Sequence, residues 1–123
     1  MTWMAEAEPI ARAYLRLAAE FGTEPRASEA AIRIALREAD HLADDVYDVP
    51  AALFFALART PRCFGAFRAM SVLVVEWHAK TLGFKLEASP QELGDLLVRV
   101  AGRTLDYDAV KAWFGERLFP YGG

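Results

Sequence analysis

The segment VPAALFFALA, at residues 49–58, constrains the fold of this chain more than any other. Proline in the first turn of a helix removes no helical hydrogen bond, so Asp48 and Pro50 predict the start of a helix that runs to about Arg59. The run is about half of the roughly 20 residues that a transmembrane helix needs. A helix that is apolar on every side must be covered by its neighbours. We therefore expect this helix at the centre of the domain, and no membrane span.

Apolar residues recur at helical spacing along most of the remaining chain. Chains of this length fold as one compact domain, so we expect residues 1–123 to form a single all-α domain of about six helices around a buried central helix. Besides the central helix, the helices are predicted at about residues 10–21, 28–39, 66–82, 89–101 and 106–118.

Local signals refine these boundaries. Ser89-Pro90-Gln91-Glu92 has the pattern of a capping box with proline at the first helical position. Ser28 and Asp106 are suitable caps for the second and the last helix. Residues 40–48 form an acidic stretch into which the second helix frays. Phe84, Lys85 and Leu86 alternate in an extended link, and the last helix is expected to bury Val110, Trp113, Phe114 and Leu118.

Composition excludes several classes of function. Hydrophobic residues make up 54% of the chain, above the roughly 45–50% of typical soluble domains, so the chain is not disordered. Lys and Arg number 14 against 17 Asp and Glu. This balance offers no basic surplus for nucleic acid, and we expect no nucleic-acid partner. A single cysteine excludes an internal disulfide. The first residues lack the basic start of a signal peptide, so we expect a cytoplasmic protein.

Two isolated chemical signals are weak. Glu38 and His41 have the E-x-x-H spacing of helical metal ligands, but a di-metal bundle needs a second such pair and two further glutamates. Asp44 and Asp45, which could add ligands, are equally explained as a solvated helix end, so no metal site is assigned. Cys63 precedes a predicted helix, where its thiol pKa could fall, but no base is near it in sequence.

The segment between the third and fourth helices is more informative. A helix N-terminus offers free N–H groups, a glycine permits close approach, and an arginine supplies charge, which together can hold an anion. Arg62, Gly65 and Arg68 provide these features. The competing interpretation is an ordinary helix–helix turn with solvated arginines.

In order and spacing, TPRCFGAFRA at residues 60–69 resembles the motif H-P-F-x-[DN]-G-N-K-R-T of the Fic/Doc family, in particular of the short death-on-curing (Doc) toxins. Pro61, Gly65 and Arg68 agree with the motif. The segment VPAALFFALAR before it resembles the helix that delivers the family's histidine. GFKLEASPQEL, at residues 83–93, resembles the family segment G-Y-x-L-x-A-S-x-E-E-L. With further likeness at 100–105 and 109–114, the resemblance spans about residues 28–118 and implies a Fic/Doc-like fold with a buried central helix after the motif.

The departures from the motif bear on function. Thr60 stands where the family has the histidine that accepts the proton of the attacking hydroxyl, and a threonine hydroxyl accepts no proton near neutral pH. Phe64 replaces the acidic or amide residue linked to the metal on the phosphates. Ala66, Phe67 and Ala69 replace the asparagine, lysine and threonine. The family activity, phosphorylation or AMPylation of a protein such as an elongation factor, is therefore expected to be absent or vestigial.

Two hypotheses follow. The first is a degenerate Doc-like protein that works by binding, either to an antitoxin-type segment or to a second copy of itself, and needs no cofactor. The second is an active phosphoryl- or nucleotidyl-transferase that modifies a protein target. It would use ATP with Mg²⁺, hold phosphate with Arg62 and Arg68, and take its base from elsewhere, such as His41. We favour the first.

Overall fold

The apolar segment at residues 49–58 forms the centre of the fold. A computed structural model describes residues 7–21, 29–60 and 67–120. In it α3 (Val49–Ala58) is buried at all ten of its positions. Pro50 lies in its first turn, where a missing N–H costs no helical hydrogen bond. α3 contacts four of the other helices, so the expectation of a buried central helix is confirmed.

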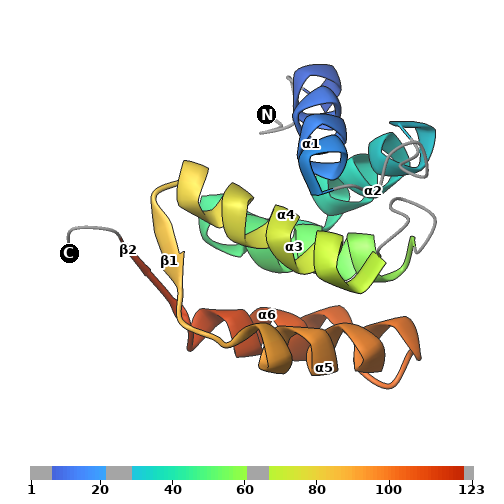
Figure 1. Cartoon of the computed structure of the whole chain (residues 1–123). Coiled ribbons are helices and arrows are strands. Elements are labelled where there is room, and N and C mark those ends of the chain that lie inside the picture. Colours follow the sequence, from blue (N-terminus) through green and yellow to red (C-terminus); the bar gives the residue numbers. More distant parts are fainter. Residues whose placement is uncertain (1–6, 22–28, 61–66, 121–123) are drawn as a thin grey trace.

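The remaining helices surround α3 in layers (Figure 1). In this view one pair lies above α3, one helix lies beside it, and a second pair lies below. The described residues thus form six α-helices, as expected for an all-α domain. The pair above is α1 (Ala7–Phe21) and α2 (Glu29–Leu42), the neighbour is α4 (Phe67–Thr81), and the pair below is α5 (Pro90–Ala101) and α6 (Tyr107–Gly115).

One hydrophobic core joins these helices. The rings of Phe54 on α3 and Phe114 on α6 lie 5.3 Å apart between centroids and are both buried. Aromatic pairs at this distance add to the stabilisation from buried area. Tyr14, the largest fully buried side chain of α1, connects that helix to the same core. α4 has a partly exposed face, so the most completely buried helix is α3 rather than the helix after the motif.

The predicted caps of the last two helices are confirmed. The Ser89 hydroxyl accepts the N–H of Glu92 at 3.1 Å, and the Glu92 carboxylate accepts the N–H of Ser89 at 3.1 Å. Asp106 accepts the N–H of Ala109 at 2.9 Å at the start of α6. Each cap satisfies N–H groups that have no partner within the helix. The cap expected at Ser28 lies outside the described residues.

The extended link and the chain end pair as a small sheet. β1 (Phe84–Leu86) and β2 (Leu118–Pro120) are antiparallel, with Leu86 opposite Leu118. The prediction that Leu118 extends the last helix is wrong, because α6 ends at Gly115 and pairing with β1 offers the later residues an alternative set of backbone partners. Trp113 is half-buried rather than buried, and the Arg117 guanidinium lies 4.0 Å from the centre of its ring.

The acidic stretch at 40–48 is more ordered than expected. α2 continues to Leu42, and a short 3-10 helix, η1 (Val46–Asp48), leads into α3. The Asp45 carboxylate accepts the N–H of Tyr47 at 2.8 Å, and the Asp48 carboxylate accepts the N–H of Asp45 at 3.0 Å. The carboxylates therefore cap this turn instead of fraying the helix.

Candidate functional site

Thr60, which aligns with the histidine of the motif that the sequence resembles, follows the C-terminal end of α3. Its hydroxyl donates to the carbonyl of Ala56 at 2.9 Å, and its N–H donates to the carbonyl of Leu57 at 3.0 Å. Both bonds go to carbonyls of the last turn of α3, where a helix supplies too few N–H partners of its own. Thr60 is half-buried, and its side chain is bonded to its own helix. Its hydroxyl is not a proton acceptor comparable to an imidazole.

A cation that the sequence did not single out lies beside Thr60. The guanidinium of Arg59 is 5.0 Å from the ring centre of Phe55, one helical turn earlier, and the Phe55 ring packs on Tyr107 at 5.6 Å. The i, i+4 spacing of an aromatic and an arginine was the available signal. Arg59 is exposed, so its charge faces solvent at the end of α3 where the helix dipole favours a cation.

The structure does not test the other motif positions. Pro61, Arg62, Cys63 and Gly65 lie outside the described residues. The backbone of Arg68 belongs to the first turn of α4, and its side chain is outside the described part. Whether the anion-binding candidates Arg62, Gly65 and Arg68 come together therefore stays a prediction.

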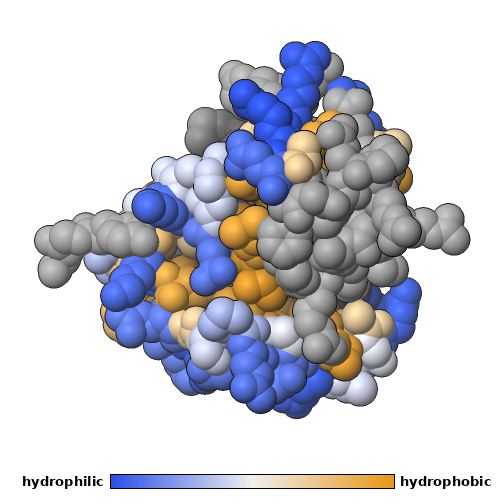
Figure 2. Space-filling view, in the orientation of Figure 1, coloured by the Kyte–Doolittle hydropathy of each residue, from blue (hydrophilic) through white to orange (hydrophobic). Residues whose placement is uncertain are grey.

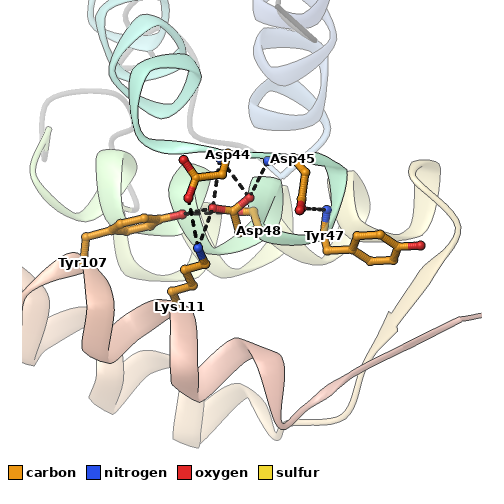
Figure 3. A network of polar contacts seen from close by, with 6 residues as sticks. All are labelled: Asp44, Asp45, Tyr47, Asp48, Tyr107 and Lys111. Atoms are coloured by element: carbon orange, nitrogen blue, oxygen red, sulfur yellow. Dashed lines mark hydrogen bonds and ion pairs between the residues drawn. The ribbon is translucent and has the colours of Figure 1, made fainter.

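The best-defined polar cluster lies at the opposite end of α3 (Figure 3). Asp48, 5% exposed, accepts the N–H groups of Asp44 and Asp45 at 3.0–3.1 Å and the hydroxyl of Tyr107 at 2.8 Å. The Lys111 ammonium lies 3.6 Å from the same carboxylate and 3.1 Å from that of Asp44. Two residues of α6 are thereby held to the corner between α2 and α3.

Opposing effects set the ionisation of this cluster. Burial alone would raise the pKa of Asp48, but the N–H donors of Asp45 and Asp44, the Tyr107 hydroxyl and the Lys111 charge outweigh it and hold the pKa below its usual value. Burial and the bond to Asp48 raise the pKa of Tyr107 far above its usual value. Asp48 is therefore a poor proton acceptor near neutral pH, and the cluster is a structural anchor rather than an acid–base pair.

The described residues place no further metal ligands beside Glu38 and His41. Glu38 and His41 are both exposed on α2. Asp44 pairs with Lys111, and Asp45 caps η1. Across residues 7–21, 29–60 and 67–120, no three His, Cys, Asp or Glu side chains gather in a way that could hold a metal ion.

A buried histidine links α1 to α4. The hydroxyl of Tyr14 and Nδ1 of His78 are 2.7 Å apart, and the two side chains are 0% and 5% exposed. Burial lowers the pKa of His78 to about 4 and raises that of Tyr14. Both groups are therefore neutral at physiological pH, and the pair acts as an internal hydrogen bond.

The exposed face of α4 carries two hollows on either side of Trp77, which is half-buried and packs against the core. The smaller, about 290 Å³, lies against α1. The larger, about 450 Å³, separates α4 from β1, and we call it the strand-edge groove. Figure 2 shows apolar surface over this part of the molecule, between the polar residues of α1 above and α5 below. The strand-edge groove is lined by Leu73, Glu76, Trp77 and Lys80 of α4 and by Phe84, Lys85 and Leu86 of β1.

Comparison with known proteins adds no relative to this description. No family model matches the chain, and neither a curated protein nor a solved structure matches it. Within the described part of the chain, every helix is too short or too polar to cross a membrane.

Proposed function

We propose that this chain is a degenerate protein of the Fic/Doc type that has lost group-transfer chemistry and works by binding another protein. The observation that carries the proposal is Thr60. It occupies the place of the family's catalytic histidine, and its hydroxyl is committed to the Ala56 carbonyl at 2.9 Å. Loss of a general base typically costs about 10²–10⁴-fold in rate.

Further substitutions in the motif support the same conclusion. Transfer of a phosphoryl or nucleotidyl group depends on positioned charges around the phosphates. Phe64, Ala66 and Phe67 replace an acid or amide, an asparagine and a lysine of the family motif. Arg68 is the one phosphate-binding side chain of the motif that this sequence keeps, and one arginine cannot replace a metal-bound phosphate clamp.

The alternative, an active transferase with a base from elsewhere, has less support. His41, the candidate base, lies in the last turn of α2, beside the corner that begins α3. Thr60 follows the other end of α3. A helix of ten residues is about 15 Å long, far beyond the roughly 3 Å reach of a general base.

Two kinds of partner are compatible with this binding function. One is an antitoxin-type segment of another protein, and the other is a second copy of this chain. The hollows on either side of Trp77, which mix apolar and charged side chains, offer the described surface for such a contact. A cytoplasmic location accompanies this proposal.

A thermal shift assay with ATP and Mg²⁺ or Mn²⁺ tests the proposal. We expect the midpoint of the parent chain to stay unchanged, because a ligand stabilises a protein only when it binds the folded state. Whatever their midpoints without nucleotide, Thr60→Ala and Arg68→Ala should likewise show no change in midpoint when nucleotide is added. Nucleotide-dependent stabilisation that disappears in Arg68→Ala would refute the binding-only function.

Expression in bacteria provides a second test. A transferase of this family type would arrest growth through its protein target. We expect no arrest that depends on Arg68. Arrest by the parent chain, relieved by Arg68→Ala at equal expression, would favour the enzyme instead.

A further inference from the structure

We propose that the strand-edge groove binds an extended segment of a partner protein, which adds as a third strand to the free edge of β1. The inference deepens the proposed binding function and rests on it for the class of partner. Strand addition requires a sheet edge with unpaired backbone groups and an adjacent surface for alternate side chains. Both are present at β1.

The register of the small sheet determines which backbone groups face the groove. Glu87 donates its N–H to the carbonyl of Arg117 at 2.7 Å. Hydrogen-bonded and non-bonded pairs alternate along an antiparallel ladder. Lys85 therefore shares the next bonded pair with β2, and the N–H and C=O groups of Phe84 and Leu86 point away from β2. Within the described part of the chain, no hydrogen bond to these groups is recorded.

The opposite edge of the sheet is less suited to a further strand. By the same alternation, Leu118 and Pro120 face outward from β2. Proline has no N–H, so this edge lacks one of its two donors, a common protection of edge strands. β1 carries no proline at its outward positions. The asymmetry directs an added strand to β1.

The groove beside β1 accepts side chains from such a strand. Its volume is about 450 Å³. Leu73 and Trp77 are half-buried on the α4 side, and Leu86 is half-buried on the strand side. A strand paired with β1 places alternate side chains on one face, so apolar residues at these positions would cover Leu73 and Trp77.

Charged residues at the groove define the rest of the ligand. Within residues 7–21, 29–60 and 67–120, Lys80 makes no ion pair, and the ion pair of Lys85 is with Glu87, at 3.7 Å between two exposed side chains. Glu76 is half-buried in the groove, and burial raises its pKa. An acidic residue of the ligand would face the two lysines, and a donor of the ligand would satisfy Glu76. The partner segment is therefore extended, apolar at alternate positions, and acidic at one or more others.

A displayed library of random linear peptides of about eight residues, enough for a typical strand, tests the proposal on the full chain. Enriched peptides should alternate apolar residues and carry an acidic one. Leu86→Pro removes the outward N–H of β1. Leu118→Pro, at the directly opposite position, removes the outward N–H of β2 and is the matched control. We expect Leu86→Pro to weaken binding about tenfold, the effect of one lost hydrogen bond, and Leu118→Pro to leave it unchanged.

Amide hydrogen exchange keeps the test valid if a proline variant does not fold. In the parent chain, an enriched peptide should slow exchange of the Leu86 amide about tenfold and leave the Leu118 amide unchanged. Absence of any enriched peptide, equal weakening by both prolines, or protection at Leu118 instead of Leu86 would overturn the proposal. Concentration-dependent protection of Leu86 without peptide would also overturn it, because a second copy would then occupy the edge. Nucleotide binding that depends on Arg68 would overturn the proposed function while leaving these results unaffected, so the two failures are distinguishable.

Discussion

Acidification is expected to destabilise this fold through His78. An unfolded histidine has a pKa near 6.5, and burial lowers the pKa of His78 in the folded chain to about 4. Above pH 6.5 both states are neutral and His78 contributes nothing to pH dependence. Between pH 6.5 and pH 4 the unfolded chain takes up a proton that the folded chain excludes, so the free energy of unfolding falls. At about 1.4 kcal/mol per pH unit over this interval, the loss is about 3 kcal/mol, and it levels off below pH 4.

Urea unfolding followed by tryptophan fluorescence between about pH 7 and pH 4 measures this loss. His78→Gln is the control, because glutamine does not titrate and its amide oxygen can still accept the Tyr14 hydroxyl. Asp48, whose pKa is lowered, loses stabilisation only as the pH falls below the ordinary carboxylate range. Glu76, whose pKa burial raises, has the opposite sign and gains stability on protonation. Both act in the parent and in the variant, so the difference between the two proteins isolates His78. Parallel pH curves for parent and His78→Gln would refute the reasoning.

Four substitutions give further predictions. Tyr107→Phe should lower the free energy of unfolding, measured in urea, by about 1.5–3 kcal/mol, because it removes a hydrogen bond to the buried Asp48 carboxylate. Lys111→Met should cost less, because the Lys111 side chain is 43% exposed and solvent weakens its ion pairs; an equal loss would contradict this ranking. Arg103→Gly should raise stability by about 0.5–1 kcal/mol, seen as a higher thermal midpoint, because Arg103 has a φ of +61° that favours glycine. Thr60→Val should cost about 1 kcal/mol by loss of the hydroxyl bond to α3, and an unchanged midpoint would argue against that bond.

The elements that sequence analysis predicted are those with local causes. The run at 49–58 had to be buried because no face of it is polar, and Ser89 with Glu92 forms a cap from residues three apart. The pairing of β1 with β2 and the bond between Tyr107 and Asp48 join residues tens of positions apart, with no periodic signal. These long-range contacts determine where the last helix ends and what the acidic stretch does.

The candidate site also combines local features, which the sequence shows, with long-range features, which it does not. The sequence shows a threonine at position 60, where the resemblance leads us to expect a histidine, and the hydrogen bond of Thr60 to the preceding turn is a local contact. The strand-edge groove was not predicted, because it depends on β1 lying beside α4. Helical spacing likewise did not show that Trp77 is only half-buried beside this groove. Spacing shows which residues share a helix face, but not which part of that face another element leaves uncovered.

The most direct test of the central claim is transfer of label from ATP to protein. The purified chain is incubated with a bacterial extract, Mg²⁺ or Mn²⁺, and ATP labelled at the α- or the γ-phosphate, so that nucleotidyl and phosphoryl transfer are both visible. A variant that restores the family motif (Thr60→His, Arg62→Phe, Phe64→Asp, Ala66→Asn, Phe67→Lys, Ala69→Thr) serves as the comparison. We predict that the parent chain labels no protein with either form of ATP. Label transferred by the parent chain, and lost in Arg68→Ala, would contradict a function by binding alone.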